Sequence, residues 1–194
     1  MSSSENFPSL HEDIMQVLLT EEQIRKRVEE LSQEINRDYW GKNPILVSIL
    51  KGSTIFLADL IRKLPFPIYL DFMVVSSYGT STRTSGIVKI VVDLKKSIEG
   101  EYVLIVEDIV DSGLTLKYMR EHLLLRKPAS LKICALLDKV EARRVNVPID
   151  YRGFIIPSEF VVGYGLDYNE RYRNLPYVGI LKPNIYQREN IVNH

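Results

Sequence analysis

The chain has 194 residues, of which 45% are hydrophobic and 26% are charged. These proportions are typical of a soluble globular protein, and the length is enough to bury one substantial core. The 25 basic and 25 acidic residues cancel. No overall field therefore favours nucleic acid or an anionic membrane, and a charged ligand must be held by local arrangement.

Cysteine content and the amino terminus bear on location. The single cysteine, Cys134, excludes an internal disulfide and favours a reducing compartment. No apolar stretch approaches membrane-spanning length, and residues 1–14 lack the basic and apolar regions of a secretion signal. We therefore expect a cytoplasmic protein that does not associate with a membrane.

The first predicted helix covers residues 20–35. Thr20 and Gln23 have the spacing of a capping box, which marks a helix start. Apolar residues then recur at helical spacing and indicate one buried stripe. These residues are Ile24, Val28, Leu31 and Ile35.

The next segments alternate between strand and helix. The continuous apolar run 44–50 predicts a strand buried on both faces, and 53–64 predicts a helix stopped by Pro65. Residues 68–78 and 87–94 predict a hairpin, joined by the Gly/Ser/Thr-rich segment 79–86, which we expect to be a mobile loop.

Alternation continues towards the carboxyl terminus. Residues 102–107 predict a buried strand, 114–127 a helix ended by Pro128, and 131–138 another strand. Shorter strand candidates are 154–156, 160–164 and 177–181. This order predicts an α/β fold with a mainly parallel sheet, and no linker or repeat divides it. We therefore expect a single domain, residues 1–194.

The run VLIVEDIVDSGLTL, residues 103–116, carries the strongest functional signal. Two acids, Glu107 and Asp108, follow a buried strand, and ligands of open α/β sheets gather at such strand ends. The following turn, Asp111–Thr115, leads into a helix, and its backbone N–H groups can bind a phosphate. One acid in such a turn is usually a cap or a solvated residue. Three acids beside an anion cradle would instead weaken anion binding.

A ribose 5-phosphate is a ligand that would suit both the acids and the anion cradle. Backbone amides of the turn would bind its phosphate, while Glu107 and Asp108 would accept hydrogen bonds from the 2- and 3-hydroxyls. The same carboxylates would stabilise a transition state with positive charge on the ribose ring, as in glycoside chemistry.

VLIVEDIVDSGLT resembles the phosphoribosyl pyrophosphate motif of the type I phosphoribosyltransferases. LKGS at 50–53 is similar to the pyrophosphate loop of the hypoxanthine-guanine enzymes, and SSYG at 76–79 to their flap. LLDK at 136–139 and the segment 159–181 match the same enzymes, and LPYVGILKP favours their bacterial branch. The resemblance implies a mainly parallel sheet flanked by helices, with a small hood and a mobile flap loop.

The resemblance also implies roles on the donor side of the site. Glu107 and Asp108 would bind the ribose hydroxyls, and the cradle Asp111, Ser112, Gly113, Leu114 and Thr115 the 5-phosphate. Lys51, Gly52 and Arg173 would contact pyrophosphate, and Ser77 and Tyr78 would close with the flap. Asp167, with Glu107 and Asp108, would serve Mg²⁺. Leu114 stands where some relatives carry lysine, and Arg83 of the flap has no assigned role.

On the base side, the resemblance implies that Asp111 acts as general base or acid near N7 of a purine. Lys139 would donate to the 6-oxo group, Phe160 would stack on the ring, and Val161 and Asp167 would lie at the base. The implied reaction is magnesium-dependent transfer of phosphoribosyl from phosphoribosyl pyrophosphate to hypoxanthine or guanine, in purine salvage. The partners are these substrates, without nucleic acid, in a homodimer or homotetramer.

Two alternatives remain at this level. A regulator with the same fold could bind nucleotide or RNA without turnover, although it would not need Lys51, Asp111 or the flap pair. An enzyme of the same family could prefer xanthine, which differs from hypoxanthine at the 2-position. Lys139 argues against adenine, because an ammonium donor meets no acceptor on an adenine amino group.

Overall fold

A computed structural model describes residues 10–77 and 88–187. The chain divides into two compact units, one of Arg25–Ser158 and one of Met1–Ile24 with Glu159–His194. None of the helices in the described part has the length and hydrophobicity that a membrane crossing needs.

The larger unit is built on a six-stranded sheet of order β4-β3-β2-β5-β6-β7. Its strands pair in parallel, except that β4 runs antiparallel to β3. The predicted mainly parallel sheet and the predicted hairpin are therefore both present. The strands are β2 (Ile45–Leu50), β3 (Tyr69–Ser77), β4 (Val88–Val92), β5 (Tyr102–Val110), β6 (Ser130–Asp138) and β7 (Tyr151–Ile155).

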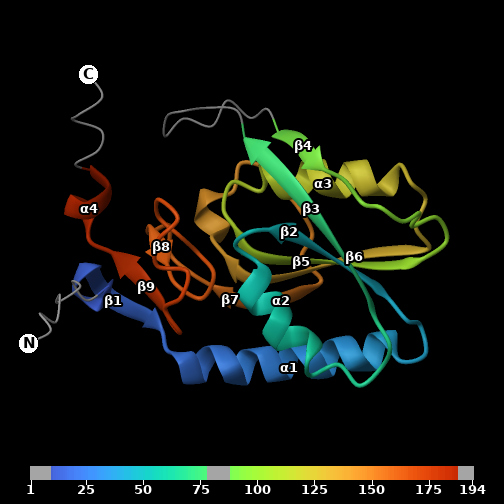
Figure 1. Cartoon of the computed structure of the whole chain (residues 1–194), viewed down its shortest axis with the longest axis horizontal. Helices are drawn as coiled ribbons and strands as arrows, with labels where there is room; N and C mark the ends of the chain where they lie inside the picture. Colours follow the sequence, from blue (N-terminus) through green and yellow to red (C-terminus); the bar gives the residue numbers. More distant parts are fainter. Residues whose placement is uncertain (1–9, 78–87, 188–194) are drawn as a thin grey trace, which may run out of the picture. The chain divides into compact units, whose positions relative to one another are not determined.

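Helices cover both faces of this sheet. α1 (Glu21–Tyr39) and α2 (Thr54–Ile61) lie on one side, and α3 (Leu114–Leu124) lies on the other (Figure 1). A short 3-10 helix, η2 (Val140–Ala142), follows β6. α3 packs Leu116, Met119 and Leu123 against the sheet, and these residues belong to the main hydrophobic core. The central strands are therefore buried on both faces, as the apolar run of β2 predicted.

α1 begins where the sequence predicts it. The backbone N–H of Thr20 donates to Gln23 Oε1 at 2.8 Å, and the N–H of Gln23 donates to Thr20 Oγ1 at 3.3 Å. The capping box is therefore formed, and the predicted stripe of Ile24 to Ile35 is buried.

The smaller unit holds a separate antiparallel sheet of order β1-β9-β8. Its elements are η1 (Leu10–Asp13), β1 (Ile14–Leu19), β8 (Val161–Val162), β9 (Val178–Leu181) and α4 (Pro183–Gln187). The sequence pattern predicts no element over 14–19 or 183–187. A small core of Val162, Tyr172, Leu175 and Leu181 holds this unit together.

Candidate active site

Three neighbouring parallel strands of the larger unit end in the loops that carry the predicted site. β5 lies between β2 and β6 in the sheet. Parallel strands end at the same edge, so Lys51 after β2, Asp111 after β5 and Lys139 after β6 emerge close together. Sheet order alone thus gathers residues that are up to 88 positions apart in the sequence.

β5 is longer than predicted, and the position of two acids changes with it. The predicted strand ended at Glu107, but β5 continues to Val110 because its pairing with β6 extends to Val110 opposite Asp138. Glu107 and Asp108 therefore lie inside the strand rather than at its end. Successive strand residues point to opposite faces, so the two carboxylates have different surroundings.

Glu107 faces a cavity with a buried, uncompensated oxygen. Its Oε2 is buried without a hydrogen-bond partner in the described structure. Burial, reinforced by the charge of Asp108, raises the pKa of Glu107 well above its ordinary value. A buried acceptor of this kind favours a ligand that brings hydroxyl donors.

Asp108 lies against the loop that follows β2. It is buried, and its Oδ1 accepts a hydrogen bond from the N–H of Ile109 at 2.9 Å. A Cβ atom at Gly52 would overlap the Asp108 carboxylate. Glycine at position 52 is therefore what allows the loop after β2 to approach the acids of β5.

The Lys51 loop is held by hydroxyl groups. Ser48 Oγ and Ser53 Oγ lie 2.6 Å apart in the interior, and Ser53 Oγ also donates to the carbonyl of Ile49. Thr54 Oγ1 donates to the carbonyl of Lys51 at 2.6 Å. The Leu50–Lys51 peptide bond is cis, which the sequence did not indicate.

The predicted phosphate cradle lines a cavity of about 160 Å³. Gly113 has φ of +80°, a conformation that favours glycine, and α3 begins at the next residue, Leu114. Among the described residues no side chain caps this helix start. The segment after η2 holds this turn, because the N–H of Arg144 donates to the carbonyl of Ser112 at 2.9 Å. The polar side chains that line the cavity are those of Glu107, Asp111, Ser112 and Thr115.

Lys139 and Asp111 meet beside this cradle. Because Val110 pairs with Asp138, the following residues leave the two strands at the same level, and Lys139 Nζ lies 2.9 Å from Asp111 Oδ2. The side chain of Lys139 is 10% exposed and that of Asp111 is 58% exposed. Packing around the Lys139 side chain therefore fixes its direction, whereas the Asp111 carboxylate faces solvent.

Asp138 fixes the end of β6, immediately before Lys139, and was not among the residues predicted from the sequence. Its fully buried carboxylate pairs with Arg143 and Arg152, each at 2.8 Å. The N–H of Lys139 donates to the carbonyl of Val110 at 2.9 Å. The sequence feature that could have indicated this role is an acid at the end of an apolar strand, followed by arginines that can pair with it.

The other predicted residues belong to the smaller unit. Asp167 Oδ1 lies 2.8 Å from Arg173 Nη2, and Asp167 Oδ2 accepts from the N–H of Glu170 at 3.0 Å. Arg173 Nη1 donates to the carbonyl of Gly165 at 2.8 Å. Val161 is buried in β8, while the Phe160 side chain before it is partly exposed.

The flap residues are described only in part. Ser77 is the last residue of β3. Tyr78 and Arg83, and with them the predicted mobile loop, lie outside the described residues.

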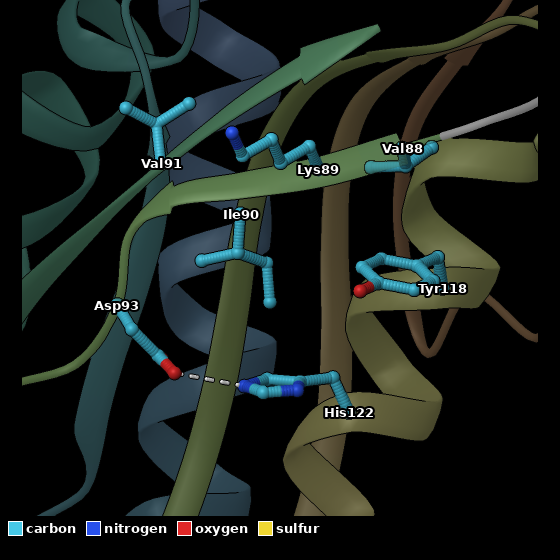
Figure 2. Close-up of a pocket in the computed structure, with 7 residues that line it drawn as sticks. All are labelled: Val88, Lys89, Ile90, Val91, Asp93, Tyr118 and His122. Carbon is cyan, nitrogen blue, oxygen red and sulfur yellow. Dashed lines mark hydrogen bonds and ion pairs between the residues drawn. The ribbon is translucent and has the colours of Figure 1, made fainter.

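A second, wider hollow of about 550 Å³ lies between β4 and α3. Figure 2 shows His122 of α3 directed at Asp93, with Nε2 at 3.0 Å from Asp93 Oδ2. Arg126 pairs with the same carboxylate. His122 and Arg126 share the Asp93 carboxylate and so join α3 and the residues after it to the edge of the sheet, which gives His122 the structural role expected of a histidine without a motif.

The fold and these loops define a phosphoribosyltransferase. The profile of the phosphoribosyl transferase domain family matches residues 16–169. The crystal structure of a hypoxanthine phosphoribosyltransferase from Staphylococcus aureus superimposes with a TM-score of 0.87 at 50% sequence identity, covering 91% of this chain and 96% of that one.

Curated relatives indicate which branch of the phosphoribosyltransferases this chain belongs to. The hypoxanthine-guanine phosphoribosyltransferase of Mycobacterium tuberculosis (strain ATCC 25618 / H37Rv) is 52% identical over 181 residues, which cover 90% of each chain. The bifunctional protein TilS/HprT of Listeria monocytogenes (serotype 4b) is 52% identical over 178 residues, but the match covers only 28% of that longer protein. The chain belongs to the hypoxanthine-guanine phosphoribosyltransferase family of bacteria.

Proposed function

We propose that the chain transfers the 5-phosphoribosyl group from phosphoribosyl pyrophosphate to a 6-oxopurine, hypoxanthine or guanine, and releases pyrophosphate. The observation that carries this proposal is the cavity in which a buried carboxylate oxygen of Glu107 and the Asp111–Thr115 turn face the same space. That combination suits a ligand with hydroxyls at one end and a phosphate at the other.

Donor binding follows from this arrangement. The turn Asp111–Thr115 binds the 5-phosphate through N–H groups and hydroxyls. Glu107 and Asp108 accept hydrogen bonds from the ribose hydroxyls, and a diol supplies the donors that buried Glu107 Oε2 needs. Lys51 and Gly52 bind the pyrophosphate at the loop after β2, with Arg173 as a further cation.

Four residues have proposed roles in recognising the base. Phe160 stacks on the purine, an interaction worth roughly 1–3 kcal/mol for any base, so it does not select one. Lys139 selects, because its ammonium donates to a 6-oxo group and finds no acceptor on a 6-amino group. Val161 and Asp167 lie at the edge of the base.

Asp167 suits Mg²⁺, which takes one or two carboxylates together with substrate phosphates. Its two oxygens are of the hard type that Mg²⁺ prefers. When bound there, or to Glu107 and Asp108, Mg²⁺ would neutralise charge on the pyrophosphate.

In the proposed reaction the lone pair of N9 forms the bond to C1 of the ribose. The bond from C1 to the pyrophosphate oxygen breaks, and its electron pair leaves with pyrophosphate. Asp111 accepts the proton from N7 of the base. The carboxylates of Glu107 and Asp108 stabilise the positive charge that develops on the ribose ring.

Pyrophosphate release tests the proposal directly. The protein is supplied with Mg²⁺ and phosphoribosyl pyrophosphate, and hypoxanthine, guanine, xanthine and adenine are compared. We expect turnover with hypoxanthine and guanine and none above background with adenine; the xanthine rate sets the substrate range. Binding of the donor without release for any base would favour a regulator with this fold.

Location, domain organisation, assembly and flap closure are proposed as well. A buried free thiol at Cys134 supports a location in the reducing cytoplasm. A single functional domain over residues 1–194 and a homodimer or homotetramer remain predictions, and closure of Ser77 and Tyr78 over the site is part of the proposed mechanism.

A further inference from the structure

Phe160 is in contact with two other aromatic side chains of its unit. Tyr186 of α4 stacks on it with ring centroids 5.0 Å apart and an interplanar angle of 22°. Tyr168 meets it in a T-shaped arrangement at 5.6 Å and 89°. Both geometries lie in the range where an aromatic pair is stabilised by more than the burial of its apolar area.

Tyr186 is itself anchored. With Ile185 it packs against the small core of Val162, Tyr172, Leu175 and Leu181. The N–H of Ile185 donates to the carbonyl of Lys182 at 3.0 Å, and the N–H of Leu181 donates to the carbonyl of Phe160 at 3.0 Å. The backbones that carry Phe160 and Tyr186 are therefore joined through the end of β9.

Phe160 needs such support. Phe160 as a whole residue is 38% exposed, and it precedes β8, a strand of only two residues. Without a neighbouring side chain on its face, the Phe160 ring would exchange between rotamers. Binding of a stacking base would then be weakened by the conformational entropy lost when the ring is ordered. A second ring fixed against one face removes that cost before the base arrives.

We propose that Tyr186 is a positioning residue for the base: it covers one face of Phe160 and presents the other to the purine. This inference rests on the proposed role of Phe160 in base stacking. In this role Tyr186 touches neither the donor nor the reacting atoms. Its loss should therefore raise KM for the base and leave both kcat and KM for phosphoribosyl pyrophosphate unchanged.

Steady-state kinetics of Tyr186→Leu test the inference, because leucine keeps an apolar contact with the core but removes the stacking ring. We expect KM for hypoxanthine to rise roughly 2- to 12-fold, the equivalent of one aromatic pair. Tyr186→Phe should restore the wild-type value. Tyr177→Leu is the matched control, because Tyr177 packs against the same core but makes its ring contact with His11.

A double-mutant cycle separates positioning from general destabilisation. In a Phe160→Leu background, Tyr186→Leu should add nothing to KM for the base, since there is no ring left to position. An unchanged or lowered KM in Tyr186→Leu, or equal effects of Tyr186→Leu and Tyr177→Leu, would overturn the inference while leaving the proposed function intact. An active wild type whose Phe160→Leu variant keeps its KM would overturn the stacking role and the inference with it. A wild type silent with every base would overturn the proposed function itself.

Discussion

Lys139 and Asp111 form an ion pair of 2.9 Å although 28 positions separate them in the sequence. The contact joins the residue proposed to select the base to the residue proposed to take its proton. Removing either partner leaves the other without its charge complement, and the cost is larger for the better-buried lysine. Each substitution must therefore be judged by which kinetic quantity it changes.

Lys139→Ala should relax discrimination against adenine. Loss of the ammonium removes the donor that favours a 6-oxo group, from a preference that can reach about 10⁴. We expect the ratio of kcat/KM for hypoxanthine over adenine to fall at least about tenfold, with KM for the donor unchanged. Lys132→Ala is the control, because Lys132 lies in β6 and is likewise paired with an acid, Asp38. A retained ratio in Lys139→Ala would exclude the proposed role.

Asp111→Asn should lower turnover far more than donor affinity. General acid-base groups contribute typically about 10²- to 10⁴-fold, and asparagine keeps the shape of the side chain without its basicity. We expect kcat to fall by that order while KM for phosphoribosyl pyrophosphate changes by less than about threefold. Thr115→Ala offers the opposite pattern, with a raised donor KM and a smaller change in kcat. Unchanged turnover in Asp111→Asn would show that another group takes the proton.

Gly52→Ala should impair donor binding. The added Cβ would overlap the Asp108 carboxylate, so the loop after β2 or the end of β5 has to move. We expect a higher KM for phosphoribosyl pyrophosphate and, for pyrophosphate in the reverse reaction, weaker binding. Gly100→Ala is the comparison, because a Cβ at Gly100 meets nothing within 4 Å although φ is +75°. Its strain should reduce stability alone, and equal donor KM values in the two variants would contradict the proposed contact.

Asp38 should make stability depend on acidic pH. Hydrogen bonds from Tyr151 and Lys132 lower its pKa from 3.8 to about 2. The unfolded chain therefore binds the proton more readily, so stability from this group is complete above about pH 4 to 5 and is lost as pH falls through about 2. Asp38→Asn should reduce the free energy of unfolding at pH 7 by about 1–2 kcal/mol, and the gap should close towards pH 2.

Denaturant titration at several pH values measures this gap. Glu121→Gln is the control, because within residues 10–77 and 88–187 the Glu121 carboxylate pairs only with Lys117, in an exposed i,i+4 contact at 3.9 Å. Such a pair contributes little, so that variant should follow the wild type throughout. A gap between Asp38→Asn and wild type that stays constant from pH 7 to pH 2 would contradict the assignment.

Local signals predicted the local structure. The Thr20–Gln23 capping box and the apolar run of β2 depend on neighbours in sequence, and both are present. The Asp111–Thr115 turn could be recognised for the same reason, because Ser112, Gly113 and Thr115 stand between an apolar run and a helical pattern. In the structure Gly113 has φ of +80° and α3 begins at the next residue.

Features that depend on distant partners escaped prediction. β5 continues through two acids because β6 pairs with it as far as Asp138. β1 forms against β9, where Ile14 pairs with Leu181. The stacking of Tyr186 on Phe160 and the burial of Asp138 between Arg143 and Arg152 likewise arise only once the chain has folded.

The register of β5 against β6 has a consequence for how this chain tolerates changes in length. Val110 and Asp138 are partners at the ends of the two strands, and Asp111 and Lys139 each follow one residue later. The segment between the strands includes α3 and the loop 125–129, and residues added in that loop would leave the pairing, and hence the acid-to-lysine distance, unchanged. One residue added inside either strand would turn every following side chain to the opposite face and separate the two groups. Natural or designed insertions compatible with activity are therefore expected in the crossover loop and not in the strands.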